Sequence, residues 1–294
     1  MAERIEHLIS LVPELKGRGA TISKLDGGLT NCNFRVDTDN ESYVVRIAGD
    51  NSSLLGIDRQ CEYECTRLAA RLDAGADVIS FLRDQGALVT RFLHGHVLSA
   101  DDIKRRVILE RLTVTLKKYH HEPSSPGYFS AFDTVRKYHA LAKEHHVSLP
   151  PSLDVALDRF LHIEEVIQRH PAAQCPCHND LLPANFIDDG KTIRIIDWEY
   201  AGIGDLFFDL GNLASNSQFE REDEELLLEL YFGQVMKPQL QKLQLMRLAS
   251  DMRESMWGFL QVGISKLDID YASYGNEHLE KFLSGYENLA VVNR

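Results

Sequence analysis

Three polar residues between positions 180 and 197 have the types and spacing that phosphoryl transfer requires. The segment has the pattern His178-x-Asp180-x-x-x-x-Asn185, and an apolar strand predicted over 193–196 leads into Asp197. Asp180 is suited to orient an acceptor hydroxyl and to accept its proton. Asn185 and Asp197 offer oxygen ligands for magnesium ions, which neutralise a triphosphate. The spacing therefore predicts magnesium-dependent phosphoryl transfer with Asp180 as the catalytic base.

These residues also have a purely structural interpretation, because Asp and Asn in loops are common turn formers and helix caps. Asp188-Asp189-Gly190, which lies between them, is predicted to be such a turn. For Asp180, Asn185 and Asp197 taken together, the ordered combination favours the catalytic interpretation. The H-x-D-x-x-x-x-N spacing is that of the protein-kinase catalytic loop.

The length and composition indicate an ordinary globular protein. With 294 residues, the chain is expected to form one large domain or two packed domains. Hydrophobic residues make up 44% and charged residues 26%, which is enough apolar content for a substantial core. The formal net charge of −12 argues against a nucleic-acid or anionic-membrane partner and is compatible with a cationic substrate.

The sequence also predicts a cytoplasmic location. No apolar run approaches the roughly 18 residues of a membrane span, and the N-terminus lacks the apolar core of a signal peptide. Five cysteines, an odd number, fit reduced thiols better than disulfides. Cys61 and Cys65 are expected to share a helix face, and Cys175-Pro-Cys177-His178 is superficially similar to a metal site. Neither pair has structural-zinc spacing, so we expect buried thiols and no zinc.

The N-terminal third has the pattern of a short helix followed by β-strands. Strands are predicted over 21–25, 34–37 and 43–48. The first two are joined by Asp26-Gly27-Gly28-Leu29-Thr30-Asn31, whose backbone amides and hydroxyl could cover phosphates. Most Gly-Gly hairpins are only turns, and the segment lacks the Gly-Lys-Ser/Thr ending of a Walker A loop.

Arg46 is a single cation in the apolar third strand. In protein kinases this strand carries the lysine that contacts the α- and β-phosphates and pairs with a glutamate of the next helix. An arginine fork suits phosphate oxygens, and Glu62 and Glu64 on a helix predicted over 57–72 are possible partners. The alternative is a solvent-facing Arg46 near ordinary surface acids, and both interpretations stay open at this point.

A connector and a helical region follow. Residues 86–93 read as a strand that runs into a hinge, where a nucleotide base could hydrogen-bond to the backbone. The doublets His120-His121 and His145-His146 are expected at helix ends or on the surface rather than as ligands. Amphipathic helical segments are predicted over 107–116, 132–141, 153–167, 220–230, 240–262 and 278–292.

The chain resembles the choline/ethanolamine kinase family, within the larger aminoglycoside-phosphotransferase and kinase-like group, over nearly its whole length. The segments that carry the resemblance are Gly27-Gly28-Leu29-Thr30-Asn31, Tyr43-Val44-Val45-Arg46-Ile47, Ile57-Asp58-Arg59 with Glu62, Leu88-Val89-Thr90-Arg91-Phe92, His178-Asn179-Asp180 through Asn185, Ile196-Asp197-Trp198-Glu199-Tyr200 and Phe208-Asp209-Leu210.

This resemblance implies a protein-kinase-like α+β fold with two lobes and with ATP and Mg²⁺ in the cleft between them. The small β-rich nucleotide-binding lobe would comprise residues 1–92, and the larger, mainly helical catalytic and substrate-binding lobe residues 93–294. Asp209 is expected to be a buried acid that braces the catalytic loop. The roles implied are catalytic base for Asp180, metal ligands for Asn185 and Asp197, and nucleotide binding for Gly27, Gly28, Thr30, Asn31, Arg46, Glu62, Arg91 and Phe92.

A small amino alcohol of the choline or ethanolamine type is the implied acceptor. A choline-like cation is bound by aromatic ring faces together with an acid. Glu199, Tyr200 and Trp257 correspond to substrate positions of the family, although Tyr and Trp are also common core residues. Eukaryotic members carry a glutamate seven residues after the acid that corresponds to Asp209, whereas this chain has Asn216. The cationic head is therefore held differently here, or it is not quaternary.

Other functions are compatible with the same motifs. The acceptor could be thiamine, an aminoglycoside or another small hydroxylated metabolite, although the aromatic block Trp198-Glu199-Tyr200 argues against a polycationic aminoglycoside. A pseudokinase that binds a nucleotide without turnover is a second class of function. The intact residues Asp180, Asn185 and Asp197 favour an active enzyme.

Overall fold

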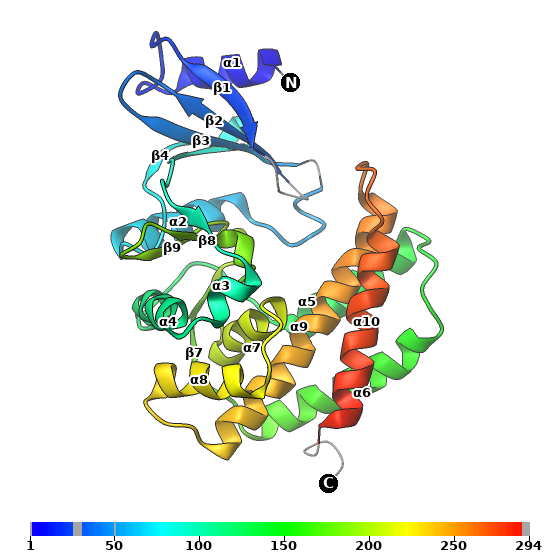
Figure 1. Cartoon of the computed structure of the whole chain (residues 1–294). Helices are drawn as coiled ribbons and strands as arrows, with labels where there is room; N and C mark the ends of the chain where they lie inside the picture. Colours follow the sequence, from blue (N-terminus) through cyan, green and yellow to red (C-terminus); the bar gives the residue numbers. More distant parts are fainter. Residues whose placement is uncertain (1, 26–30, 50, 290–294) are drawn as a thin grey trace.

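A computed structural model of the chain describes residues 2–25, 31–49 and 51–289. An antiparallel β-sheet forms the N-terminal part, and a larger, mainly helical part follows it (Figure 1). This architecture confirms the predicted two-lobed α+β fold.

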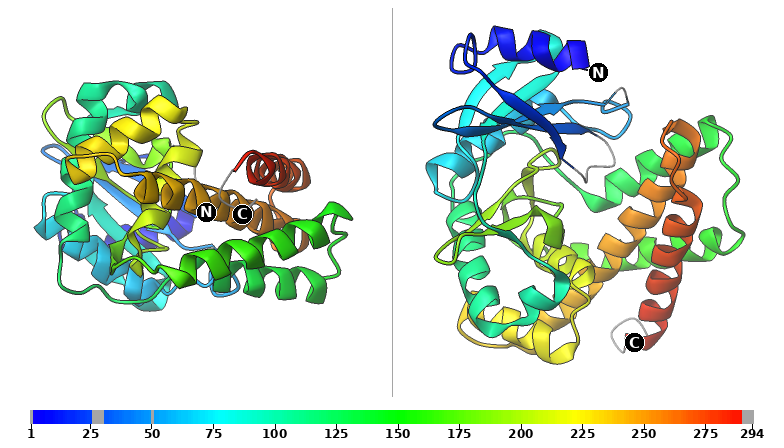
Figure 2. Two further views of the ribbon diagram at one scale, coloured as in Figure 1. Left: turned by 90° about the horizontal axis from the view of Figure 1, so that it is seen from below. Right: turned by 45° about the horizontal axis from the view of Figure 1, so that its top comes forward.

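The N-terminal sheet has five antiparallel strands in the order β1-β2-β3-β5-β4. Helix α1 (Ala2–Leu11) lies over it, as the right-hand view of Figure 2 shows. Its apolar residues Ile5 and Leu8 recur at helical spacing and pack on alternate residues of the strands, such as Val36 and Val45. The strands are β1 (Thr21–Leu25), β2 (Cys32–Asp37), β3 (Ser42–Ile47), β4 (Val78–Leu82) and β5 (Ala87–Arg91).

Helix α2 (Arg59–Arg71) connects the two parts. Asp58 caps its N-terminus by accepting hydrogen bonds from two backbone N–H groups. Its buried residues Cys65 and Leu68 pack in the core of the helical part rather than in the core of the sheet. Helix α2 therefore precedes the predicted lobe boundary at residue 92 and yet packs with the second lobe. The boundary itself stays a prediction.

Helix α9 (Lys237–Ile264) is the centre of the helical part, and five other helices pack against it. Residues 248–261 are buried on all sides of the helix, so this stretch runs through the core. It nevertheless contains the charged residues Asp251, Arg253 and Glu254. The other helices are α3 (Ala100–Lys104), α4 (Arg106–His120), α5 (Ala131–Glu144), α6 (Ser152–Arg169), α7 (Leu206–Asn216), α8 (Arg221–Phe232) and α10 (Tyr271–Asn288).

Two small sheets hold the segments that carry the predicted catalytic residues. Strand β7 pairs with β10, and β8 pairs with β6 and β9. The turn between β8 and β9 contains Gly190 with a φ of +89°, which confirms the predicted Asp-Asp-Gly turn. The strands are β6 (His96–Val97), β7 (Gln174–Cys177), β8 (Phe186–Asp188), β9 (Ile193–Ile195) and β10 (Gly202–Asp205).

Several elements differ from the sequence prediction. Helix α7 and the short strands β6, β7, β8 and β10 were not predicted, and β4 and α10 differ for the following reasons. Strand β4 was not predicted, because all five of its residues are half-buried and it lacks the alternation that marks a strand with one buried face. Helix α10 begins at Tyr271 rather than at residue 278. Its first turns contain Ser, Gly and Asn, which resemble a loop, but Asp270 caps the helix by accepting a hydrogen bond from the backbone N–H of Ser273.

None of the helices within the described ranges is long and apolar enough to cross a membrane. The five cysteines are free thiols. Cys61 and Cys65 share a face of α2, with their sulfur atoms 3.9 Å apart, as predicted.

Candidate active site

Asp209 of α7 holds the loop that follows β7. Its buried carboxylate accepts hydrogen bonds from the backbone N–H groups of His178 (2.8 Å) and Asn179 (2.6 Å). Asn179 has a left-handed backbone conformation with a φ of +65°, which asparagine tolerates better than most residues. One carboxylate thus fixes the two residues that precede Asp180. The predicted bracing role of Asp209 is confirmed.

His178 links this loop to the segment that leads to Asp197. Its Nδ1 accepts a hydrogen bond from the backbone N–H of Asp180 (3.2 Å), and its Nε2 donates to the carbonyl of Ile196 (3.0 Å). A neutral ring with its proton on Nε2 satisfies both contacts. Burial lowers the pKa of His178 to about 4. His178 is therefore a neutral residue that links two segments by hydrogen bonds, and it does not act as a general acid.

Asp180, the predicted base, is buried and contacts a cation of α9. Its Oδ1 accepts a hydrogen bond of 2.9 Å from Nη2 of Arg253. Burial raises the pKa of Asp180 to about 7; the positive charge of Arg253 opposes this rise, and the negative charge of Glu254 adds to it. A carboxylate with a pKa near neutrality is suited to accept a proton from a hydroxyl group.

Asn185 and Asp197 lie on neighbouring segments, joined by a hydrogen bond from the N–H of Ile196 to the carbonyl of Asn185 (3.0 Å). The side-chain Nδ2 of Asn185 donates to the carbonyl of Asp180, which leaves its Oδ1 for another partner. Asp197 has a φ of +71°, a conformation that is strained for a residue with a side chain. A carboxamide oxygen and a carboxylate are ligands that Mg²⁺ prefers, so the donor chemistry fits the predicted metal.

Arg46 of β3 points toward acids and not toward solvent. Its Nη1 pairs with Oε1 of Glu62 (2.7 Å) and with Oδ1 of Asp197 (2.6 Å). Burial opposes the charge, but the carboxylates of Asp197, Glu62 and Glu199 outweigh this effect and raise the pKa of Arg46. Glu64, the other candidate partner, is exposed. The solvent-facing alternative for Arg46 is therefore wrong.

Arg59 adds a second cation to the same cluster. Its Nη1 pairs with Oε2 of Glu62 (2.7 Å) and with Oε2 of Glu199 (3.0 Å), and its Nη2 donates to Oδ1 of Asn31 (2.9 Å). Asn31 in turn donates to Glu199 (2.8 Å). Arg59 thus connects a predicted nucleotide residue to a predicted substrate residue. The predicted phosphate-covering residues Gly27, Gly28 and Thr30 lie outside the described residues.

Arg91 and Phe92 lie where β5 runs into the connector. Arg91 pairs with Glu41 (2.6 Å), and the guanidinium of Arg35 lies over the ring of Phe92, 4.2 Å from its centroid. The backbone N–H of Phe92 donates to the carbonyl of Ser42 (2.9 Å). Both side chains thus have partners within the sheet, and their nucleotide-binding role stays a prediction.

Tyr200 lines a cavity of about 510 Å³ and also contacts the arginine that holds Asp180. The guanidinium of Arg253, which holds Asp180, lies over the Tyr200 ring with Cζ 5.4 Å from the centroid. The cavity is lined by Tyr200 together with residues of α2, α5 and the segment before α5, including Phe129 and Tyr138. Tyr200 therefore forms a wall shared by the candidate site and this cavity.

Trp257 and Asn216, the other two predicted substrate residues, lie on α9 and at the end of α7. Trp257 is buried and packs edge-to-face against Tyr271 and Tyr274 of α10, with centroid distances of 5.7 Å and 5.6 Å. Asn216 ends α7, and its Nδ2 donates to the carbonyl of Leu181 (3.3 Å). Trp257 thus has core-like packing, and a substrate contact by either residue stays a prediction.

The sequence prediction missed three residues that the structure brings to this region: Arg253, Arg59 and His120. Arg253 and Glu254 gave a usable signal, since charged residues in a mostly apolar helical stretch are rarely buried without a partner. Arg59 stands in a segment that carries the family resemblance, although no role was predicted for it, and His120 gave no such signal because it stands at a helix end in a polar local context.

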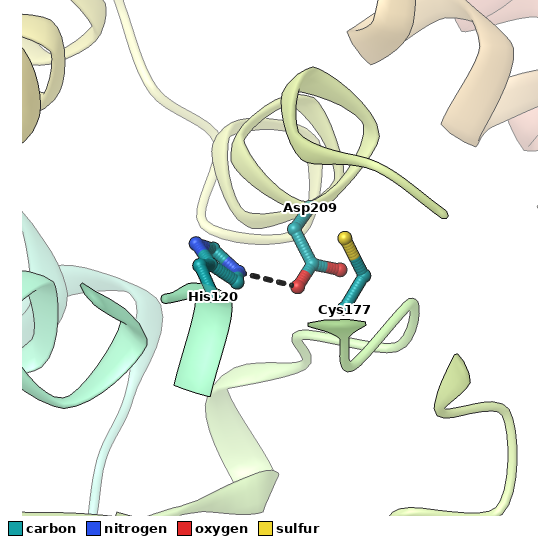
Figure 3. A group of neighbouring side chains, drawn as sticks. All are labelled: His120, Cys177 and Asp209. Carbon is teal, nitrogen blue, oxygen red and sulfur yellow. Dashed lines mark hydrogen bonds and ion pairs between the residues drawn. The ribbon is translucent and has the colours of Figure 1, made fainter. Parts of the chain in front are cut away.

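His120, Cys177 and Asp209 lie together in the core (Figure 3). His120 ends α4 as predicted, but it is buried rather than exposed. Its Nε2 bonds to Oδ2 of Asp209 (3.0 Å) and its Nδ1 to the hydroxyl of Tyr231 (2.8 Å). Burial raises the pKa of Cys177 and keeps the thiol protonated. Hydrogen bonds engage both ring nitrogens and both carboxylate oxygens, so the cluster is a brace rather than a metal site.

Comparisons with known proteins agree with this geometry. Residues 21–241 match the phosphotransferase enzyme family. The chain is 31% identical over 218 residues to the protein LicA of Haemophilus influenzae; the match covers 72% of this chain and 62% of that relative, less than two thirds of its length. It is 25% identical over 322 residues to the probable ethanolamine kinase A of Dictyostelium discoideum, with 96% and 91% covered.

A solved structure has a similar fold over almost the whole chain. It is the crystal structure of a choline/ethanolamine kinase family protein from Mesorhizobium loti, with 25% sequence identity and a TM-score of 0.86. The superposition covers 99% of this chain and 96% of that chain.

Proposed function

This chain belongs to the phosphotransferase enzyme family, and we propose that it transfers the γ-phosphoryl group of ATP to the hydroxyl of a small amino alcohol of the choline or ethanolamine type. The proposal rests above all on the ion pairs of Arg46 with Glu62 and Asp197. Arg46 is a cation suited to bind phosphate, and Asp197 is an acid suited to bind magnesium. Asp197 lies on the segment that is hydrogen-bonded to the Asp180 loop through Ile196 and Asn185. The names of the relatives support the amino-alcohol acceptor.

Asp180 acts as the base in this proposal. Because Arg253 holds Oδ1, Oδ2 is the oxygen that orients the acceptor hydroxyl and accepts its proton as the oxygen attacks the γ-phosphorus. The bond from phosphorus to the β,γ-bridging oxygen breaks, and the products are ADP and a phosphate monoester. Phosphoryl transfer depends mainly on positioning and charge stabilisation, which suits a site with fixed side chains.

ATP and Mg²⁺ are held by the residues between the two lobes. Arg46 contributes a guanidinium to phosphate oxygens, and Asn31 and Glu62 fix its surroundings. Asn185 and Asp197 would hold Mg²⁺, which neutralises the charge on the phosphate oxygens when it is bound. The connector that follows Phe92 would offer backbone groups to the nucleotide base, since the N–H groups of Arg91 and Phe92 themselves bond to Asp77 and Ser42.

The alternatives are a kinase for thiamine or an aminoglycoside, and a nucleotide-binding protein without turnover. One argument against an aminoglycoside becomes weaker, because Trp198 is buried in the core and packs against Tyr119, with centroids 4.3 Å apart. Tyr200 remains as the aromatic residue of that block. The names of the relatives therefore carry the preference for an amino alcohol.

The testing experiment measures ATP consumption with Mg²⁺ across a panel of acceptors. The panel contains ethanolamine, its N-methylated derivatives, choline, thiamine and an aminoglycoside. We expect turnover with at least one of the amino alcohols and none above background with the aminoglycoside. An inert panel, with ATP binding retained in calorimetry, would refute the proposal and support the nucleotide-binding protein without turnover.

A further inference from the structure

A cation of the protein itself occupies the ring face of Tyr200 beside Asp180. The guanidinium of Arg253 lies over this ring, with Cζ 5.4 Å from the centroid. It donates hydrogen bonds of 2.9 Å to the carbonyl of Asn179 and to Oδ1 of Asp180, and only 2% of its side chain is exposed. Arg253 is thus fixed in place, and the attraction of this ring face for a cation is already used.

Glu254, the carboxylate next to Arg253 on α9, also has partners within the protein. Glu254 pairs with Arg253 (3.0 Å) and accepts a hydrogen bond from the hydroxyl of Tyr274 (2.8 Å). Its Oε1 is buried and, although it is ion-paired, has no aligned hydrogen-bond donor among the described residues. The buried hydroxyl of Tyr200 likewise has no aligned hydrogen-bond partner among those residues; it neighbours the hydroxyl of Tyr138, which donates to the carbonyl of Leu55. Two buried oxygens beside Arg253 could therefore accept hydrogen bonds from a ligand.

Two kinds of ammonium group would respond differently to these surroundings. A quaternary ammonium has no N–H, so it depends on free ring faces and on charge. It would meet the fixed guanidinium of Arg253, an occupied Tyr200 face and a Trp257 ring packed against Tyr271 and Tyr274. A primary ammonium has three N–H donors and can hydrogen-bond to the two unsatisfied oxygens.

We propose that Arg253 is a specificity-determining residue that selects an acceptor with N–H groups on its ammonium and disfavours a quaternary one. This inference rests on the proposed function and narrows it to the unmethylated end of the amino-alcohol series. Asn216 is consistent with it, because this position carries no charge to attract a quaternary head.

The first test uses the wild-type protein with ethanolamine, N-methylethanolamine, N,N-dimethylethanolamine and choline. The expected result is a stepwise decrease in kcat/KM, with choline ~2- to 30-fold below ethanolamine, since this is the range that a lost cation–π contact corresponds to in affinity. If choline is used as well as ethanolamine, the inference is wrong while the proposed function stands. If none of the four amines is phosphorylated, the proposed function itself is wrong, and the inference is wrong with it.

The second test compares variants by the ratio of kcat/KM for choline to that for ethanolamine. Arg253→Gln removes the charge and should raise the ratio by ~2- to 30-fold, whereas Arg253→Lys keeps the charge and should leave it low. Loss of the contact with Asp180 lowers kcat for both acceptors and cancels in the ratio. Arg247→Gln on the same helix removes a pair with Glu224 and serves as the control with an unchanged ratio. A folded Arg253→Gln protein with the wild-type ratio would overturn the inference.

Discussion

Arg253 and Asp180 form a hydrogen-bonded ion pair of 2.9 Å between two positions that lie 73 residues apart in the chain. Helix α9 therefore supplies the charged partner of the predicted base Asp180, and this partner lies outside the catalytic loop. A buried carboxylate without a partner is costly, and the guanidinium compensates its charge while keeping it next to the Asn185 and Asp197 segment. The base and its surroundings are thus assembled by the helical lobe.

Replacing Asp180 with Asn removes the proton acceptor but preserves the shape of the side chain and an oxygen for Arg253. We expect kcat to fall by ~10²- to 10⁴-fold, because general base catalysis contributes about that much. ATP affinity, measured by calorimetry, should stay within about threefold of the wild type. Asp180→Ala should be equally inactive. A kcat above one tenth of the wild-type value in either variant would contradict the assigned role.

Replacing Arg46 with Met tests the phosphate-binding cation. Loss of charge-assisted hydrogen bonds to phosphate, worth about 1.5–3 kcal/mol, should raise the KM for ATP by ~10- to 150-fold. Arg46→Lys should recover part of this loss, since lysine keeps the charge without the fork. The matched control is Arg106→Met on α4, which removes an exposed ion pair with Glu229 of α8. If Arg46→Met had the same KM for ATP as the control, Arg46 would not bind phosphate, and its role would be limited to the ion pairs with Glu62 and Asp197.

Replacing Asp209 with Asn tests the brace beneath the loop. An amide group would place N–H donors against the N–H of His178 or Asn179, so the free energy of unfolding should fall by about 3–5 kcal/mol in urea denaturation. Asp101→Asn is the control: its side chain is 97% exposed, and the expected change is within about 0.5 kcal/mol.

The same denaturation experiment tests the absence of a metal in the brace. In the absence of nucleotide and magnesium, EDTA should leave the wild-type unfolding midpoint unchanged, because hydrogen bonds account for the contacts of His120 and Asp209. A lower midpoint with EDTA would instead indicate a bound ion.

His178 predicts a pH dependence of stability. Its pKa is lowered to about 4 by burial, compared with 6.5 in an unfolded chain. Between these values the unfolded state binds a proton that the folded state excludes, so the contribution to stability is fully present above pH 6.5 and is lost as the pH falls to 4. The loss should approach about 3 kcal/mol.

The measurement is the free energy of unfolding at several pH values for the wild type and for His178→Gln. The variant should lose less stability than the wild type between pH 6.5 and pH 4. His96→Gln, at an exposed position, should follow the wild type. Parallel curves for His178→Gln and the wild type would contradict the buried neutral ring.

Local sequence patterns were sufficient to predict the catalytic loop and the strands of the N-terminal sheet other than β4, whereas the brace Asp209 was implied by the family resemblance. The loop and the strands depend on neighbours within a few positions, such as the alternation in β3 or the spacing from Asp180 to Asn185. The choice of Glu62 over Glu64 as the partner of Arg46 was also implied by the family resemblance, and the structure agrees.

The contacts that the sequence did not reveal are long-range. Arg59 meets Glu199, and Arg253 meets Asp180, only because α2 and α9 pack beside the loops after β9 and β7. Spacing along one helix does not determine which distant loop its side chains contact. His120 was assigned to a helix end on local grounds, and its burial follows from the packing of α4 against the segment that carries Cys177.

The central claim is the transfer of a phosphoryl group from ATP to an amino alcohol, with Asp180 as base. The most direct measurement follows the ³²P of γ-labelled ATP during incubation of the protein with Mg²⁺ and ethanolamine, and identifies the labelled product. We expect a labelled phosphate monoester with the wild type and none above background with Asp180→Asn. Binding of ATP without a labelled monoester, or release of the label only as inorganic phosphate, would contradict the account.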